Sequence, residues 1–314
     1  MIVDLPDSTA SGVQRALVKI RAEGGAVALG RVLTLVISTR IGVEEETIAA
    51  ANAASREHPM RVIVVSRSAN PDGEQPRVDA QIRVGGDAGA SEVILLRAHG
   101  EAGVDEEGLI TGLLLPDAPV VAWWPHEAPE VVSESPLGRI AQRRITDAST
   151  QGDPTAALQH LARTYRPGDT DFAWTRLTLW RAILAATLDQ PPFERVEGVE
   201  VTGAVDSPST TLLAAWLGLR LEVPVALPVP DRSTGSSGIH GVRLARASGV
   251  IDLERTVPNI ATLSQPGQPT HHVSLPRRSL RDCLAEELRR LDPDDLYGEV
   301  LTKGLARLPE QSAG

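Results

Sequence analysis

LLLPDAPVVAWWP, residues 113–125, is the stretch that decides the expected fold. Its segment 120–124 is β-branched and aromatic with no alternating polar residue, which predicts a short strand that is apolar on both faces. The preceding segment 116–119, Pro-Asp-Ala-Pro, is typical of a turn. Pro125 ends the strand, because proline fixes φ and has no N–H to donate. A strand of this kind is expected in the middle of a parallel sheet covered by helices on both sides.

Two further strands and a helix extend this sheet toward the N-terminus. Residues 31–38 (RVLTLVIS) and 61–66 (RVIVVS) flank an alanine-rich helix over 43–56. This is a βαβ unit, so the two strands should be parallel neighbours. Residues 92–97 form another expected strand. The alternating segment 78–84 is typical of an edge or antiparallel strand.

A second region is predicted to begin near Arg166, where the sequence continues with Pro-Gly. Residues 171–188 read as one long helix with an apolar stripe, and residues 101–115 carry an earlier helix. Short strands between turns, from residue 224 to residue 275, predict an antiparallel sheet. The expected fold class is therefore α/β, with an N-terminal α/β domain (residues 1–166) whose largely parallel sheet is flanked by helices. A C-terminal α+β domain (residues 167–314) with an antiparallel sheet follows it.

The amino-acid composition argues against several classes of protein function. The 314 residues include 41 acidic and 31 basic side chains, for a net charge of −10, which argues against a nucleic-acid binder. No apolar run is long enough to span a bilayer, and the first residues lack the pattern of a signal peptide. We therefore expect a cytoplasmic protein without membrane contact. Cys283 is the only cysteine, which excludes an intrachain disulfide or a zinc-thiolate site. It lies on a helical apolar stripe and is expected in the core.

No motif predicts catalysis. The glycine-rich segment 85–89 is not GxGxxG and precedes a strand, whereas a phosphate site needs a helix N-terminus. His126-Glu127 lacks the second histidine of a zinc motif. The only lysines, Lys19 and Lys303, lie outside any P-loop, and the other 29 basic residues are arginine, as is typical of a GC-rich genome. We therefore predict no catalytic, cofactor-binding or metal-binding residues.

The best candidates for contact with a partner are tryptophans and arginines. Trp123 and Trp124 end the central strand, where α/β folds meet ligands. They should point to opposite faces, with Trp124 the more exposed because it precedes Pro125. Guanidinium groups recognise phosphate or carboxylate bidentately, although surface ion pairing with the many carboxylates is the better explanation of each arginine taken alone. The predicted contact residues are Trp123, Trp124, Arg143, Arg144, Arg176, Trp180 and Arg181.

Long stretches of the chain, in order, resemble the actinobacterial branch of the glucose-6-phosphate dehydrogenase assembly protein family, OpcA. They include AANAASREHPMRVIVV, RVDAQIRVGGDAGASEVILLR and the central stretch LLLPDAPVVAWWP. The remaining ones are PLGRIAQRRITDA, GDTDFAWTRLTLWRAILAATLDQPP and RDCLAEELRRLDPDDLY. The six stretches occupy residues 50–65, 77–97, 113–125, 136–148, 168–192 and 281–297.

The resemblance implies a non-enzymatic partner of glucose-6-phosphate dehydrogenase. Such a protein promotes the active oligomer of that enzyme and raises its activity in the oxidative pentose phosphate pathway. The family offers no catalytic residues to transfer, and the oligomeric state of this chain within a complex stays open. The alternative from the residues themselves is a sugar-phosphate-binding protein or cryptic enzyme that uses the carboxyl edge of the N-terminal sheet.

Overall fold

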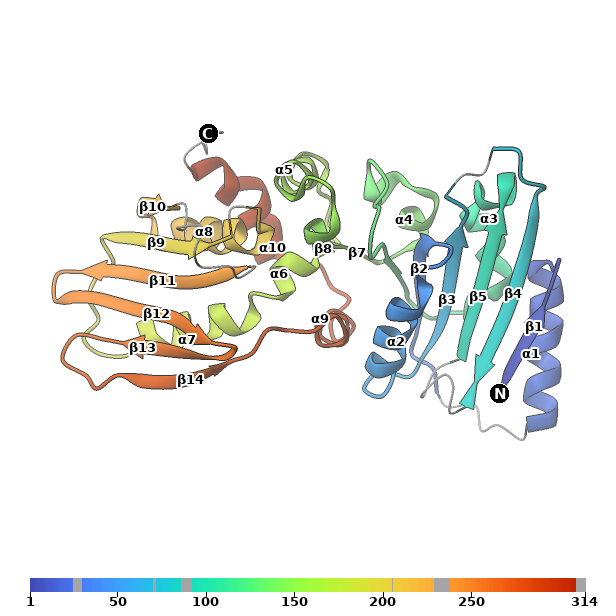
Figure 1. Ribbon diagram of the computed structural model, residues 1–314, viewed down its shortest axis with the longest axis horizontal. Helices are drawn as coiled ribbons and strands as arrows, with labels where there is room; N and C mark the ends of the chain where they lie inside the picture. Colours follow the sequence, from blue (N-terminus) through green and yellow to red (C-terminus); the bar gives the residue numbers. More distant parts are fainter. Residues whose placement is uncertain (25–29, 70–71, 86–91, 205, 229–237, 309–314) are drawn as a thin grey trace. The chain divides into compact units, whose positions relative to one another are not determined.

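The computed structural model describes residues 1–24, 30–69, 72–85, 92–204, 206–228 and 238–308 (Figure 1). The glycine-rich segment 85–89 falls largely outside them. The chain forms two compact units, each assembled from separate segments. Unit 1 comprises Met1–Asp147, Gly168–Thr170 and Ser279–Pro293, and unit 2 comprises Ala148–Pro167, Asp171–Arg278 and Asp294–Gly314. The proposed division into domains at residue 166 stays a prediction.

Unit 1 is built on an eight-stranded sheet in the order β1-β4-β5-β3-β2-β6-β7-β8. Its middle five strands are parallel, whereas β4 is antiparallel to β5 and β1 is antiparallel to β4. The α/β fold class and the parallel β2-β3 unit are thus confirmed. The strands are β1 (Ile2–Leu5), β2 (Leu33–Arg40), β3 (Met60–Arg67), β4 (Arg77–Val84), β5 (Glu92–His99), β6 (Val120–Trp123), β7 (Arg143–Thr146) and β8 (Asp169–Asp171).

The central strands of unit 1 are buried on both faces, as their unbroken apolar sequences require. In β2, seven consecutive residues from Leu33 are buried. Helix α2 packs against β2 and β3, and α9, which comes late in the chain, packs against α2. The helices are α1 (Ala10–Gly24), α2 (Glu44–Ala54), α3 (Glu106–Ile110), α4 (Pro136–Ile140) and α9 (Leu280–Glu287), with 3-10 turns η2 (Gly100–Gly103), η3 (Thr111–Leu113) and η4 (Val132–Glu134).

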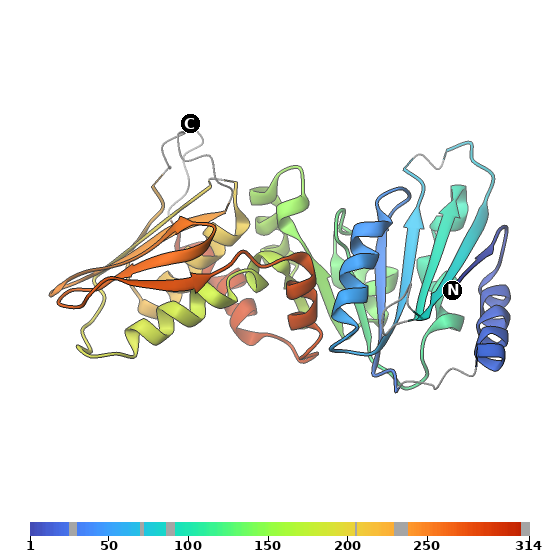
Figure 2. The same cartoon turned by 60° about the horizontal axis from the view of Figure 1, so that its bottom comes forward.

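Unit 2 contains a six-stranded sheet in the order β10-β9-β11-β12-β13-β14. Its helices cover one face of the sheet (Figures 1 and 2), and burial alternates along β9 as expected for a sheet with one face toward solvent. The strands are β9 (Gly198–Gly203), β10 (Val225–Ala226), β11 (Ile239–Arg246), β12 (Gly249–Val257), β13 (Asn259–Ser264) and β14 (His271–Leu275).

The helical elements of unit 2 contribute to one apolar core. Trp174, Trp180 and Tyr297 are among its largest buried side chains. The elements are the 3-10 turn η5 (Ala148–Thr150), α5 (Pro154–Thr164), α6 (Phe172–Thr175), α7 (Thr178–Leu188), α8 (Pro208–Leu221), α10 (Asp295–Glu299), the π-helical turn η7 (Val300–Gly304) and the 3-10 turn η8 (Leu305–Arg307).

Three expectations about elements were wrong. The helix over 101–115 is broken into η2, α3 and η3, because Asp105 caps a new start by accepting from Gly108 N. The helix over 171–188 is divided into α6 and α7. The edge strand β10 is parallel to β9, not antiparallel. Sequence reasoning missed β9, and with it the β9-α8-β10 crossover, which makes the two strands parallel.

Candidate functional site

The carboxyl edge of the parallel strands in unit 1 is the natural place for a site, because open α/β sheets bind ligands where the strand order reverses. From β2 the chain moves to β3 on one side, and it later returns to β6 on the other side of β2. The reversal therefore lies between β2 and β6. Across it, Arg40 Nη1 and Glu127 Oε1 form an exposed ion pair at 3.4 Å.

Glu44 occupies the centre of this edge. It opens α2 and is 3% exposed. Its carboxylate accepts from Gly42 N at 2.7 Å, Ser66 Oγ at 2.9 Å and Arg97 Nε at 3.1 Å. Burial by itself would raise the pKa of Glu44, but the hydrogen bonds from the backbone, Ser66 and Arg97 together lower it below 4.5. Glu44 is therefore a buried carboxylate held in its ionised form.

A second buried carboxylate follows the same pattern. Glu106 opens α3, is 7% exposed, and accepts from Ser38 Oγ at 2.6 Å. The guanidinium of Arg67 lies 3.2 Å from the same carboxylate. Sequence reasoning missed both Glu44 and Glu106. The available signal was an acidic residue in the first turn of each helix that follows a buried strand.

Trp123 and Trp124 are both inside unit 1, at 0% and 1% exposure. The expected difference in exposure between the two rings is therefore absent. Trp124 still pairs with the neighbouring strand, where its backbone N donates to Ile145 O at 2.9 Å. Both rings fill the core of unit 1, and their assignment to a partner surface stays a prediction that would require this core to open.

Arg143 and Arg144 are buried and bind carboxylates of the chain itself. Arg143 donates through Nε and Nη2 to Glu287 and through Nη1 to Asp292 O at 2.8 Å. Arg144 donates through Nε to Asp169. The arginines are 4% and 7% exposed. These bonds are of the type expected of guanidinium groups, but the observed acceptors belong to unit 1 and not to a ligand.

The remaining predicted residues, Arg176, Trp180 and Arg181, lie in unit 2. Trp180 is 2% exposed, whereas both arginines are half-buried. Arg181 stacks over the Trp174 ring, with Cζ 3.7 Å from the ring centroid. Arg176 Nη1 donates to Ser149 Oγ at 3.1 Å. Of the seven predicted contact residues, these two arginines alone reach the surface.

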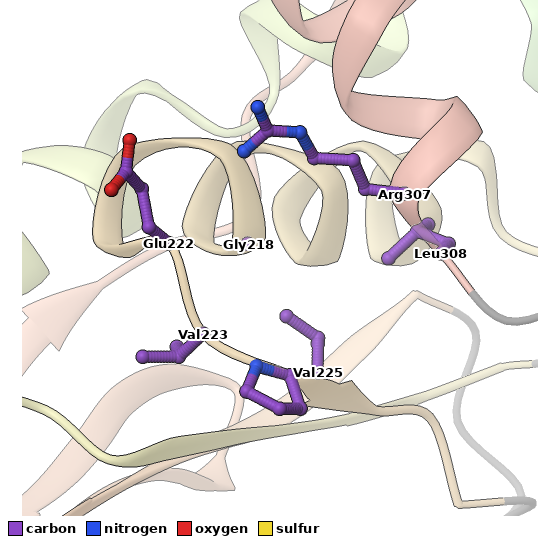
Figure 3. Close-up of a pocket in the computed structure, with 7 residues that line it drawn as sticks. Gly218, Glu222, Val223, Val225, Arg307 and Leu308 are labelled. Carbon is purple, nitrogen blue, oxygen red and sulfur yellow. The ribbon is translucent and has the colours of Figure 1, made fainter.

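A hollow in unit 2 lies between the end of α8 and strand β10, with a volume of about 430 Å³. Figure 3 shows Val225 and Leu308 on either side of it, while the charged ends of Glu222 and Arg307 point away. The lining thus combines apolar side chains with one carboxylate and one guanidinium. The lining residues are Gly218, Glu222, Val223, Pro224, Val225, Arg307 and Leu308.

Metal ligands and membrane spans are both missing from the described part of the chain. No group of three or more histidine, cysteine or acidic side chains is arranged to hold a metal ion there. Within the same residues, every helix is too short or too polar to cross a membrane. Cys283 is fully buried on α9, which confirms its expected place in the core.

Comparison with protein families gives matches over most of the chain. Residues 51–163 match the family described as the N-terminal domain of the glucose-6-phosphate dehydrogenase subunit. Residues 167–301 match the family described as the C-terminal domain of the same subunit. No curated protein sequence matches this chain significantly.

Among solved structures, a 3-ketoreductase from Actinomadura kijaniata is similar at 11% identity and a TM-score of 0.48, covering 88% of this chain and 96% of its own. An oxidoreductase from Sinorhizobium meliloti has the same identity, coverage and TM-score. An inositol dehydrogenase homologue from Azotobacter vinelandii is 8% identical with a TM-score of 0.40, covering 90% and 96% of the two chains. Similarities this distant carry no argument about activity.

Proposed function

Because this chain belongs to the family of glucose-6-phosphate dehydrogenase assembly subunits, we propose that it is a non-enzymatic assembly factor and allosteric activator of that dehydrogenase. It binds the enzyme in the cytoplasm and promotes the active oligomer in the oxidative pentose phosphate pathway. A partner raises activity only by binding the competent state of the enzyme more tightly than the incompetent one. The proposal therefore requires a complex and a shift in the apparent substrate affinity of the enzyme.

One observation favours this function over the alternative of a sugar-phosphate binder or cryptic enzyme. The alternative needs Arg143 and Arg144 to bind phosphate near the end of the central strand. Both guanidinium groups instead hold the carboxylates of Glu287 and Asp169, and both side chains are less than a tenth exposed. A phosphate would have to displace these partners, at the cost of separating two buried ion pairs.

The test mixes the purified protein with the glucose-6-phosphate dehydrogenase of the same organism. Light scattering after size exclusion should show a complex at micromolar concentrations, and the apparent KM for glucose 6-phosphate should fall. The absence of a complex at these concentrations would contradict the proposal. Calorimetry of this chain alone with glucose 6-phosphate, 6-phosphogluconate and NADP tests the alternative, which requires saturable heat from one of them.

We propose Arg176 and Arg181 as part of the contact surface, since they alone among the predicted residues reach the surface. Charge reversal to glutamate at either position should weaken the complex while leaving secondary structure intact. Arg243→Glu is the matched control, because Arg243 is an exposed arginine on strand β11 of the same unit. Equal weakening by all three variants would point to a general charge effect and not to this surface.

A further inference from the structure

The parallel strands of unit 1 have the order found in folds that bind dinucleotides. The order β5-β3-β2-β6-β7 corresponds to 3-2-1-4-5 in the doubly wound folds that bind dinucleotides. In those folds the pyrophosphate lies at the N-terminus of the helix that follows the first strand, and the helix dipole and unpaired backbone N–H groups attract it. The equivalent place here is the turn between β2 and α2.

The residues of this turn do not fit a dinucleotide. Gly42 is the only glycine between β2 and α2. If Gly42 is taken as the first glycine of GxGxxG, the second falls on Glu44 and the third on Thr47. The second glycine normally lets the pyrophosphate approach the backbone, and the third allows close packing of helix on strand. A glutamate at the second position puts a bulky anion where the phosphate would lie.

The Glu44 carboxylate fills the anion position of this turn with donors that precede α2 or come from neighbouring strands. Its carboxylate takes the N–H of Gly42 at 2.7 Å, the hydroxyl of Ser66 at 2.9 Å and the guanidinium of Arg97 at 3.1 Å. These donors come from the turn, from β3 and from β5. The side chain is 4% exposed, so the donors are shielded from a competing ligand in solution. Burial acts to raise the pKa of Glu44, but these bonds outweigh it and lower the pKa.

The position that recognises the adenine-linked ribose is also engaged. In dinucleotide-binding folds it lies about 20 residues beyond the glycine motif, and an arginine there accepts the 2′-phosphate of NADP. Arg67, at the end of β3, is the corresponding residue. Its guanidinium is paired at 3.2 Å with Glu106, which also accepts from Ser38. The Arg67 side chain is nevertheless 42% exposed, so this pair neutralises part of its charge without burying the guanidinium.

From these contacts we infer that the Glu44 carboxylate is a built-in substitute for the phosphate, which closes this crevice of unit 1 to NAD and NADP. The turn is then a structural joint between β2, β3 and β5, not a cofactor site. This inference concerns the isolated chain and holds whether or not the chain binds a dehydrogenase, so its test is separate from the test of the complex.

The test is to remove the substitute and offer inorganic phosphate. Glu44→Gly restores the second glycine and uncovers the donors. Glu45→Gly is the matched control, because it makes the same change one residue later, where the side chain is 69% exposed. Melting temperatures are compared in millimolar phosphate and in chloride of equal ionic strength. Phosphate should raise the melting temperature of Glu44→Gly more than that of the wild type or Glu45→Gly.

An equal response to phosphate in all three proteins would overturn the inference. If Glu44→Gly does not fold, calorimetry of the wild type with NADP and NADPH keeps the inference falsifiable. No saturable binding is expected at millimolar cofactor. A Kd below about 100 µM, which corresponds to more than ~5 kcal/mol of binding free energy, would show that the crevice is open.

Discussion

Replacing Arg143 with methionine should destabilise the protein strongly. Arg143 and Glu287 are 5% and 6% exposed in their side chains, and two nitrogens of the guanidinium bind the same carboxylate. A third nitrogen donates to Asp292 O at 2.8 Å. Methionine has a similar length but no donors. The variant would leave the Glu287 carboxylate and the Asp292 carbonyl buried without these bonds. Removing one partner of a buried ion pair costs about 3–5 kcal/mol of stability.

An internal control lies two residues after Glu287, on the same segment of unit 1. Arg289 Nη2 binds Glu57 at 2.9 Å, but these side chains are 58% and 53% exposed. Exposed pairs contribute roughly 0–1 kcal/mol, so Arg289→Met should be almost neutral. Both arginines connect to residues far earlier or later in the chain, and they differ mainly in burial. The comparison therefore isolates the effect of burial.

The assay is urea unfolding followed by circular dichroism, with the free energy of unfolding taken from midpoint and slope. The double variant Arg143→Met/Glu287→Leu should lose less than the sum of its single variants, since it removes both charges together. A loss for Arg143→Met no larger than that for Arg289→Met would refute the reasoning. If Arg143 served only a partner surface, the variant would keep its stability and lose binding of the dehydrogenase.

Three further outcomes are expected. Trp124→Ala should cost roughly 3–5 kcal/mol of stability, like other large-to-small core changes, as measured by urea unfolding; a loss below about 1 kcal/mol would contradict its burial. Glu44 has a folded-state pKa below 4.5, so its contribution should be present above that pH and disappear as pH falls through the folded-state value. Glu44→Gln should therefore have a flatter acid limb in a plot of melting temperature against pH, and an unchanged limb would contradict this. Gly298→Ala places a Cβ 2.5 Å from Tyr165 Oη and should cost about 1–3 kcal/mol, whereas Gly112→Ala, with no atom within 4 Å, should not; equal melting temperatures would contradict the clash.

The central strands were predictable because their own residue types require burial. A run such as Leu33–Arg40, or Val120–Trp123, is apolar on both faces, and a parallel sheet between helices is the arrangement that buries both. Strand β9 (Gly198–Gly203) was missed because GVEVTG is short, contains polar positions and begins and ends in glycine. Its place in the sheet depends on pairing with β11, some 40 residues later, which local periodicity cannot report.

The site was harder to predict for the same reason. Arg143 was recognised as a candidate for binding an anion of a ligand or partner, and in the structure it binds a carboxylate of the chain itself. The acceptor, Glu287, lies 144 residues away in the sequence and is brought back by a segment that rejoins unit 1. Sequence pattern shows that a helix has an apolar face, but not which core receives it. When a later segment of the chain buries a charged residue in this way, the sequence alone does not distinguish that residue from one that binds a partner at the surface.

The buried ion pairs give a physical reason for arginine in place of lysine at some positions. Both lysines, Lys19 and Lys303, form exposed pairs within one helical turn. By contrast, the buried carboxylate of Glu92 is shared by Arg21, Arg31 and Arg61. Burial lowers the pKa of the Arg61 guanidinium, Glu92 raises it again, and the nearby arginines lower it. Arginine tolerates this because its ordinary pKa is far above that of lysine and its donors are spread over a planar fork, whereas a buried lysine readily loses its proton. Genome composition alone explains an arginine-rich surface, but these interior sites would select arginine on physical grounds in any genome.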